Sequence, residues 1–213
     1  MSSNETFTID ERLEITLAKD LIRKNLRDLF EGLPIGYYEH FKTAILTGGA
    51  IGSILRKETP NDWDMYLEQS SADNFMKKVL ANTDNIQASI LELPHKYTGT
   101  KVNGKYVTAY ATTFVNKLLV ITGFNKTHRL EFDFVHCMPY FDMKTQKLHI
   151  SKQQYSACKE KKLIKNPRVV KPAGEMHTSI KRIEKLLDRG WTLMPTWPNE
   201  SLDISDESAI VSK

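Results

Sequence analysis

Hydrophobic residues near the N-terminus of the chain recur at helical spacing. Apolar side chains recur near helical spacing at Leu13, Leu17, Leu21, Leu26, Leu29 and Phe30. A capping-box sequence, Thr8-Ile9-Asp10-Glu11, precedes this run, and Gly32 with Pro34 ends it. The pattern predicts a long amphipathic helix whose apolar residues pack against the segments that follow.

Shorter apolar runs predict a sheet and then more helices. Residues 42–47 and 63–67 have the pattern of strands, and residues 50–56 and 72–81 that of helices. Turn-forming residues then separate strand-like runs at 86–93, 106–115, 118–124, 129–135 and 140–150. Helical patterns return at 151–162 and 173–189, and Gly190 stands where a C-terminal cap is expected.

This order predicts an α+β protein, in which a mixed β-sheet is flanked by helices. An amphipathic helix lies at the N-terminal end and a helical segment at the C-terminal end. We expect residues 1–150 to form the core and residues 151–195 to form a basic helical segment packed on it. Residues 196–213 form an acidic tail that we expect to be mobile.

Composition and terminal sequence favour a cytoplasmic protein. Of the 213 residues, 40% are hydrophobic and 26% are charged, which is ordinary for a globular domain. No apolar run approaches the roughly 20 residues that cross a bilayer, so we expect no membrane partner. The first residues lack the basic and apolar regions of a secretory signal, so Cys137 and Cys158 are expected to be reduced thiols.

Positive charge is concentrated towards the C-terminal end. The net charge is only +4, but residues 159–189 hold ten Lys or Arg against four acidic residues. Lys181, Arg182 and Lys185 fall within about one turn of the predicted helix. Such a cluster suits a phosphate-bearing partner, and a solvated helix face is the alternative explanation.

The residues best suited to chemistry are two aspartates and a glycine pair. Asp62 and Asp64 alternate along a predicted strand, so both carboxylates project from one face. Such carboxylates repel each other unless a hard cation such as Mg²⁺ lies between them, or unless solvent screens both. Gly48-Gly49 ends one strand and opens a helix, where exposed N–H groups can receive a phosphate.

This combination resembles the nucleotidyltransferase superfamily of DNA polymerase β, poly(A) polymerases and tRNA CCA-adding enzymes. Twelve residues separate Gly48-Gly49 from the Asp62-x-Asp64 motif, which lies among apolar residues. Gly48-Gly49-Ala50-Ile51 is most similar to the start of the motif in CCA-adding enzymes. Those enzymes usually continue with Arg-Asp, where this chain has Gly52-Ser53.

The superfamily uses a third carboxylate from a later strand. In the run 129–135, Asp133 lies between Phe132 and Phe134 and resembles that carboxylate, with Glu131 as the reserve candidate. The alternative is an ordinary edge strand whose acidic side chains are solvated.

The resemblance assigns a role to each of these residues. Asp62, Asp64 and Asp133 would be catalytic and would bind two Mg²⁺ or Mn²⁺ ions. The phosphates of a nucleoside triphosphate (NTP) would be held by Gly48, Gly49, Ser53, Lys181, Arg182 and Lys185. Ser53 is equally well explained as an ordinary helix residue.

The implied activity is metal-dependent transfer of a nucleoside monophosphate from an NTP, such as ATP, to a hydroxyl, with release of pyrophosphate. The basic C-terminal region favours an RNA 3′ end, such as that of tRNA, as the acceptor. A protein or a small molecule remains an alternative acceptor. A non-catalytic nucleotide- or RNA-binding protein on the same fold is the second alternative.

Overall fold

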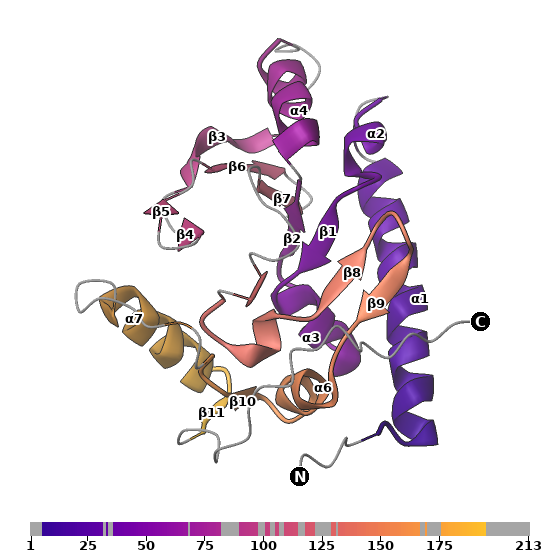
Figure 1. Ribbon diagram of the computed structural model, residues 1–213, viewed down its shortest axis with the longest axis vertical. Coiled ribbons are helices and arrows are strands. Elements are labelled where there is room, and N and C mark those ends of the chain that lie inside the picture. The colour runs from indigo at the N-terminus through magenta and orange to yellow at the C-terminus, as the bar shows by residue number, and fades with distance from the viewer. Residues whose placement is uncertain are drawn as a thin grey trace.

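The structure is a computed structural model, shown in Figure 1. It describes residues 6–31, 33, 36–67, 69–81, 90–97, 101–102, 105–106, 109–114, 118–121, 129–130, 132–166, 169 and 176–194. The predicted acidic tail at 196–213 and the reserve candidate Glu131 lie outside these residues.

A mixed β-sheet flanked by helices confirms the predicted α+β fold class. The helices are α1 (Ile9–Glu31), α2 (Tyr38–Phe41), α3 (Gly49–Leu55), α4 (Gln69–Ala81), α6 (Lys152–Lys159) and α7 (Met176–Leu187), and a 3-10 turn, η3, covers Val135–Cys137. The strands are β1 (Ile45–Thr47), β2 (Trp63–Tyr66), β3 (Ile90–Tyr97), β4 (Lys101–Val102), β5 (Lys105–Tyr106), β6 (Ala109–Phe114), β7 (Leu118–Ile121), β8 (Tyr140–Asp142), β9 (Lys147–His149), β10 (Lys162–Leu163) and β11 (Thr192–Leu193).

A seven-stranded mixed sheet organises the molecule. Its strand order is β3-β6-β7-β2-β1-β8-β9, in which β2 and β7 run parallel and the other neighbours run antiparallel. Strands β10 and β11 form a small parallel pair apart from this sheet. The antiparallel register of β1 and β2 places Thr47 opposite Asp64, so the end of β1 meets the start of β2.

The two faces of the sheet carry different residues because side chains alternate along each strand. Leu46, Met65 and Val120 lie in the main core together with the buried residues of α1 and α3. Ile45, Tyr66 and Ile121 form a second cluster on the opposite face. Figure 1 shows α1 running past β8 and β9 at one side of the molecule and α7 at the other.

Local capping signals fix the ends of two helices. The Thr8 N–H donates to Glu11 Oε2 at 2.9 Å, and the Glu11 N–H donates to Thr8 Oγ1 at 3.2 Å, which confirms the predicted capping box. Gly190 follows α7 with φ at +78°, and its N–H donates to Leu187 O at 2.9 Å. This left-handed turn confirms the predicted C-terminal cap.

The face of α1 that packs on the core differs in part from the prediction. Leu26 and Phe30 are buried as expected, but Leu13, Leu17 and Leu21 are exposed. The N-terminal half is instead buried through Ile15, Ala18 and Ile22. Two apolar lines run along this half at helical spacing, and only packing against the sheet selects between them.

Strand β3 continues through Pro94, where the sequence predicts an end. Its pairing with β6 shifts register between Glu92 and His95. A proline lacks the N–H that a regular ladder needs, so a bulge at this point lets the strand continue.

Within the described helices, none is long and apolar enough to cross a bilayer.

The buried line of α1 gives a direct test of this packing. We expect Ile22→Ala to lower the free energy of unfolding by about 2–4 kcal/mol, because it leaves a cavity in a fully buried site. Leu17→Ala, on the exposed line, is the matched control and should change it by less than about 0.5 kcal/mol. Urea unfolding followed by circular dichroism measures both, and a larger loss for Leu17→Ala would contradict the assignment.

Candidate active site

The site begins at the turn between β1 and α3. Gly48 has φ +84° and ψ −152°, a backbone conformation that is essentially restricted to glycine. A Cβ atom built on Gly48 would lie 2.5 Å from Asp64 Oδ2. Glycine is therefore required both by the backbone and by the close approach of the Asp64 carboxylate.

Hydrogen bonds from β1 and the turn reach the segment around η3. The Thr47 hydroxyl lies 2.8 Å from both Cys137 O and Pro139 O, and the Gly48 N–H donates to Cys137 O at 3.4 Å. Thr47 is fully buried, so these contacts satisfy its polar group inside the protein. They connect the Gly48 turn to a segment some 90 residues later in the chain.

Asp64 carries the strongest electrostatic perturbation at the site. Burial above all, together with repulsion by Asp62, raises the pKa of its carboxyl group from 3.8 to about 7, and the charge of Arg182 opposes this rise. The two aspartates are therefore close enough to interact, as the alternation in the sequence predicts. Trp63 and Met65 face the main core, as expected.

Asp133 reaches the site from a different kind of segment than predicted. Residues 129–135 were expected to form a strand, and this expectation is wrong. Phe134 makes a single bridge to Lys165, between short 3-10 turns. The Asn166 side-chain amide donates to Leu130 O at 2.7 Å and Phe132 O at 2.9 Å, so it occupies carbonyls that a neighbouring strand would use.

Arg182, on α7, interacts with the carboxylates of both Asp133 and Asp64. Its Nη1 lies 3.8 Å from Asp133 Oδ2, and its charge lowers the pKa of Asp64. The buried Cys137 thiol, whose pKa is raised by burial to about 11, experiences Arg182, Asp64 and Asp133 together. The fold therefore gathers charged groups from β2, the η3 segment and α7 around one point.

The remaining predicted residues lie on α3 and α7. Gly49 is exposed at the start of α3, and Ser53 is partly buried within α3. Lys181 and Lys185 are exposed on α7 beside Arg182. Of the three predicted α7 cations, only Arg182 forms an ion pair with a site carboxylate among the described residues.

The carboxylate oxygens of Asp62, Asp64 and Asp133 are the donor type that Mg²⁺ and Mn²⁺ prefer. Because Gly48 has no side chain, the Asp64 carboxylate can lie close to the backbone at this turn. Within the described residues, however, no three His, Cys, Asp or Glu side chains stand close enough together to hold a metal ion. The Asp62–Asp64 pair fits the chemistry of such an ion, and the full three-carboxylate site stays a prediction.

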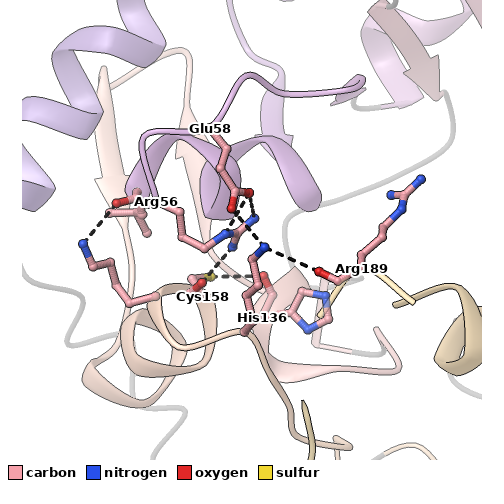
Figure 2. A network of polar contacts seen from close by, with 8 residues as sticks. Arg56, Glu58, His136, Cys158 and Arg189 are labelled. Atoms are coloured by element: carbon pink, nitrogen blue, oxygen red, sulfur yellow. Dashed lines mark hydrogen bonds and ion pairs between the residues drawn. The ribbon is translucent and has the colours of Figure 1, made fainter. Parts of the chain in front are cut away.

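A second polar network near the site was not predicted from the sequence (Figure 2). The Arg56 guanidinium donates to Cys158 O at 2.7 Å and to Glu58 Oε2 at 2.9 and 3.0 Å. Lys161 Nζ lies 3.0 Å from Glu58 Oε1 and 3.5 Å from Arg189 O. The network ties the end of α3 to α6 and to the end of α7, the helix that carries Arg182.

Aromatic packing reinforces this connection. The Arg56 guanidinium carbon lies 5.1 Å from the Trp191 ring centre, and the His136 ring lies 4.2 Å from Trp191 on another side. His136 is buried, and desolvation lowers its pKa to about 3, so it packs as a neutral ring. These contacts fix the chain just beyond α7 against the η3 segment.

The network leaves little room for a side chain at Gly52. A Cβ atom on Gly52 would lie 3.1 Å from Arg56 Nη1 and 3.5 Å from Cys158 Sγ. The missing side chain leaves room for the Arg56 guanidinium and for α6. The sequence shows only a glycine within an apolar helix at this position. Such a glycine has several possible causes, so it does not predict contact with Arg56.

Comparison with solved structures gives CCA-adding and tRNA-processing enzymes at low identity. The CCA-adding enzyme of Thermotoga maritima complexed with tRNA has 14% identity and a TM-score of 0.48, over 75% of this chain and 38% of that chain. A tRNA-processing enzyme with CTP has 13% identity and a TM-score of 0.44, over 71% and 40%. An apo CCA-adding enzyme has 13% identity and a TM-score of 0.46, over 79% and 42%. This chain thus spans about two fifths of the length of these structures.

Comparison of the sequence with family models gives a more specific assignment. Residues 20–161, which are 142 of the 213 residues, match the Gabija anti-defense 2 family. The chain belongs to the Gabija anti-defense 2 family. No curated protein matches the sequence.

The glycine turn gives a paired prediction. We expect Gly48→Ala to destabilise the fold by about 1–3 kcal/mol, because alanine is strained at this φ and its Cβ collides with Asp64. Gly49→Ala is the matched control, since nothing lies within 4 Å of its Cβ position, and it should be neutral or stabilising by up to about 1 kcal/mol. Chemical denaturation measures both variants, and equal stability of the two would contradict the close approach of the Asp64 carboxylate to Gly48.

The raised pKa of Asp64 predicts a pH dependence of stability. The folded state retains the proton up to about pH 7, whereas the unfolded chain releases it near 3.8, so the folded state loses stability as pH rises between these values. In the presence of EDTA, we expect Asp64→Asn to be about 1–3 kcal/mol more stable than wild type at pH 8, with the difference vanishing near pH 4.

Denaturation curves at several pH values measure this difference. Asp188→Asn, which removes an exposed aspartate after α7, controls for the loss of one negative charge. A stability difference between Asp64→Asn and wild type that stays constant from pH 4 to pH 8 would rule out the raised pKa.

Proposed function

We propose that this protein is a metal-dependent nucleotidyltransferase that acts against the Gabija system. The observation that carries the catalytic part is the arrangement of the Asp64 carboxylate against the Gly48 backbone, with Asp62 beside it and Arg182 facing it. A strand–Gly-Gly–helix turn packed against paired carboxylates provides both a place for phosphates and acidic groups for a divalent ion. The family to which the chain belongs supports the anti-defence part.

The chemistry is attack of an acceptor hydroxyl on the α-phosphorus of an NTP. A new oxygen–phosphorus bond forms, the bond between the α-phosphorus and the α–β bridging oxygen breaks, and pyrophosphate leaves. The hydroxyl proton passes to a base, for which Asp133 is the candidate. Divalent ions, when bound, supply activation of the hydroxyl and neutralisation of the leaving group. Asp62, Asp64 and Asp133 are the residues that would hold them.

The chain's own cations have distinct roles in this proposal. Arg182 balances the charges of Asp133 and Asp64, and its guanidinium is a group that would contact the triphosphate. Lys181 and Lys185, exposed on the same helix, would hold the outer phosphates, together with Gly48, Gly49 and Ser53.

Two different acceptors of the nucleoside monophosphate are possible under this proposal. The sequence favours an RNA 3′ end, whereas membership of an anti-defence family favours a component of the Gabija system. We therefore propose that the acceptor is a hydroxyl on a Gabija component, with a cellular RNA 3′ end as the competing acceptor.

Transfer of label from each α-³²P-labelled NTP tests the reaction. We expect wild-type protein with Mg²⁺ or Mn²⁺ to label one acceptor in extracts of cells that carry a Gabija system. Asp62→Asn combined with Asp64→Asn should reduce labelling by about 100-fold or more, because metal binding contributes several kcal/mol to such reactions. Nuclease and protease treatment of the labelled product distinguishes an RNA acceptor from a protein acceptor.

Asp188→Asn, which removes an exposed aspartate outside the proposed metal-binding set, is the matched control and should label like wild type. Labelling that survives the double substitution would contradict the assigned catalytic residues. Metal-dependent NTP binding without any labelled product would instead favour the non-catalytic binding protein.

A further inference from the structure

A cavity of about 310 Å³ lies away from the candidate active site. It opens between the C-terminal half of α1, helix α2 and the turn that joins β8 to β9. Its volume falls in the range of pockets that bind small molecules in proteins.

The central sheet separates this cavity from the candidate active site. Phe141, which lines the cavity, pairs with Leu46 and belongs to the main core under α1. Asp64 pairs with Thr47, one residue beyond Leu46 along β1. Because side chains alternate along a strand, Asp64 projects from the face opposite to that of Phe141. A ligand in this cavity would therefore not touch the carboxylates.

The inner wall of the cavity is apolar and aromatic. Phe30 and Phe141 are buried at its floor, and Met143 lies beside them. Tyr38 lines the opening, with its ring 5.5 Å from the Phe30 ring in an edge-on arrangement and 45% of its surface exposed. An exposed tyrosine next to buried aromatic rings offers a surface on which a planar ring can pack.

Positive charge lies at the rim. Arg23 and Arg27 line the cavity from successive turns of α1, and Glu31 follows on the next turn. The Arg23 guanidinium lies 3.8 Å from the exposed Asp20 carboxylate, a contact that solvent weakens. The cavity lining holds two guanidinium groups and one carboxylate, so its net charge is positive. Guanidinium groups bind phosphate and carboxylate through paired hydrogen bonds.

We propose that this cavity binds a small aromatic anion. Its ring packs among Phe30, Tyr38 and Phe141, and its phosphate or carboxylate group contacts Arg23 and Arg27. This binding site is independent of the proposed transferase activity, because none of its residues belongs to the Gly48–Asp64 site.

Titration calorimetry of the full chain with 2-naphthyl phosphate tests the proposal, with 2-naphthol as the uncharged analogue. We expect one naphthyl phosphate to bind per chain, and naphthol to bind about tenfold or more weakly because it lacks the anion. Arg27→Gln should weaken naphthyl phosphate binding about tenfold, and Tyr38→Ala should weaken it by a similar factor. Both side chains are exposed, so the folded state should persist.

Lys24→Gln removes one charge from the same helix without altering the cavity wall, and it should bind like wild type. No binding up to about 1 mM would overturn the proposal. Equal affinity for naphthol, or unchanged affinity in Arg27→Gln, would do the same. Weakening by Arg182→Gln in place of Arg27→Gln would locate the probe at the Gly48–Asp64 site and would also overturn it.

Discussion

The close approach between the Gly48 backbone and the Asp64 carboxylate is the constraint on which the candidate active site depends. It requires β1 and β2 to be antiparallel neighbours with Thr47 opposite Asp64, and it requires a residue without a side chain at the turn. Once this contact is made, the carboxylate is shielded from water and close to Asp62, which explains its raised pKa. The charged groups of Asp62 and Arg182 both act on this carboxylate.

Placement of the opposing cation depends on a connection between distant parts of the chain. Arg56 at the end of α3 binds α6 through Cys158 O and lies over Trp191, the residue that follows the α7 cap. Helix α7 thereby presents Arg182 to Asp133 and Asp64. A cluster of carboxylates without a divalent ion is unfavourable, and a guanidinium in this position offsets part of that repulsion.

The sheet divides the molecule into two chemically different sides. The face with Asp64 carries charged groups and the Gly48 turn, whereas the face under α1 carries the main core and, at its edge, an aromatic cavity with arginines at the rim. The proposed transferase site and the proposed ligand site therefore lie on opposite faces of the sheet.

Features that depend only on neighbouring residues could be predicted from the amino-acid sequence. The Thr8 capping box, the Gly190 cap, the strand–Gly48–helix order and the alternation of Trp63, Asp64 and Met65 are all local, because the backbone geometry of each depends on residues a few positions apart. Tertiary structure decided which apolar line of α1 is buried. It also decided the irregular path around Asp133, where the amide of Asn166 occupies the carbonyls of a would-be strand. The Arg56 network and the pairing of Arg182 with Asp133 likewise join groups far apart in sequence, so no periodicity or motif could encode them.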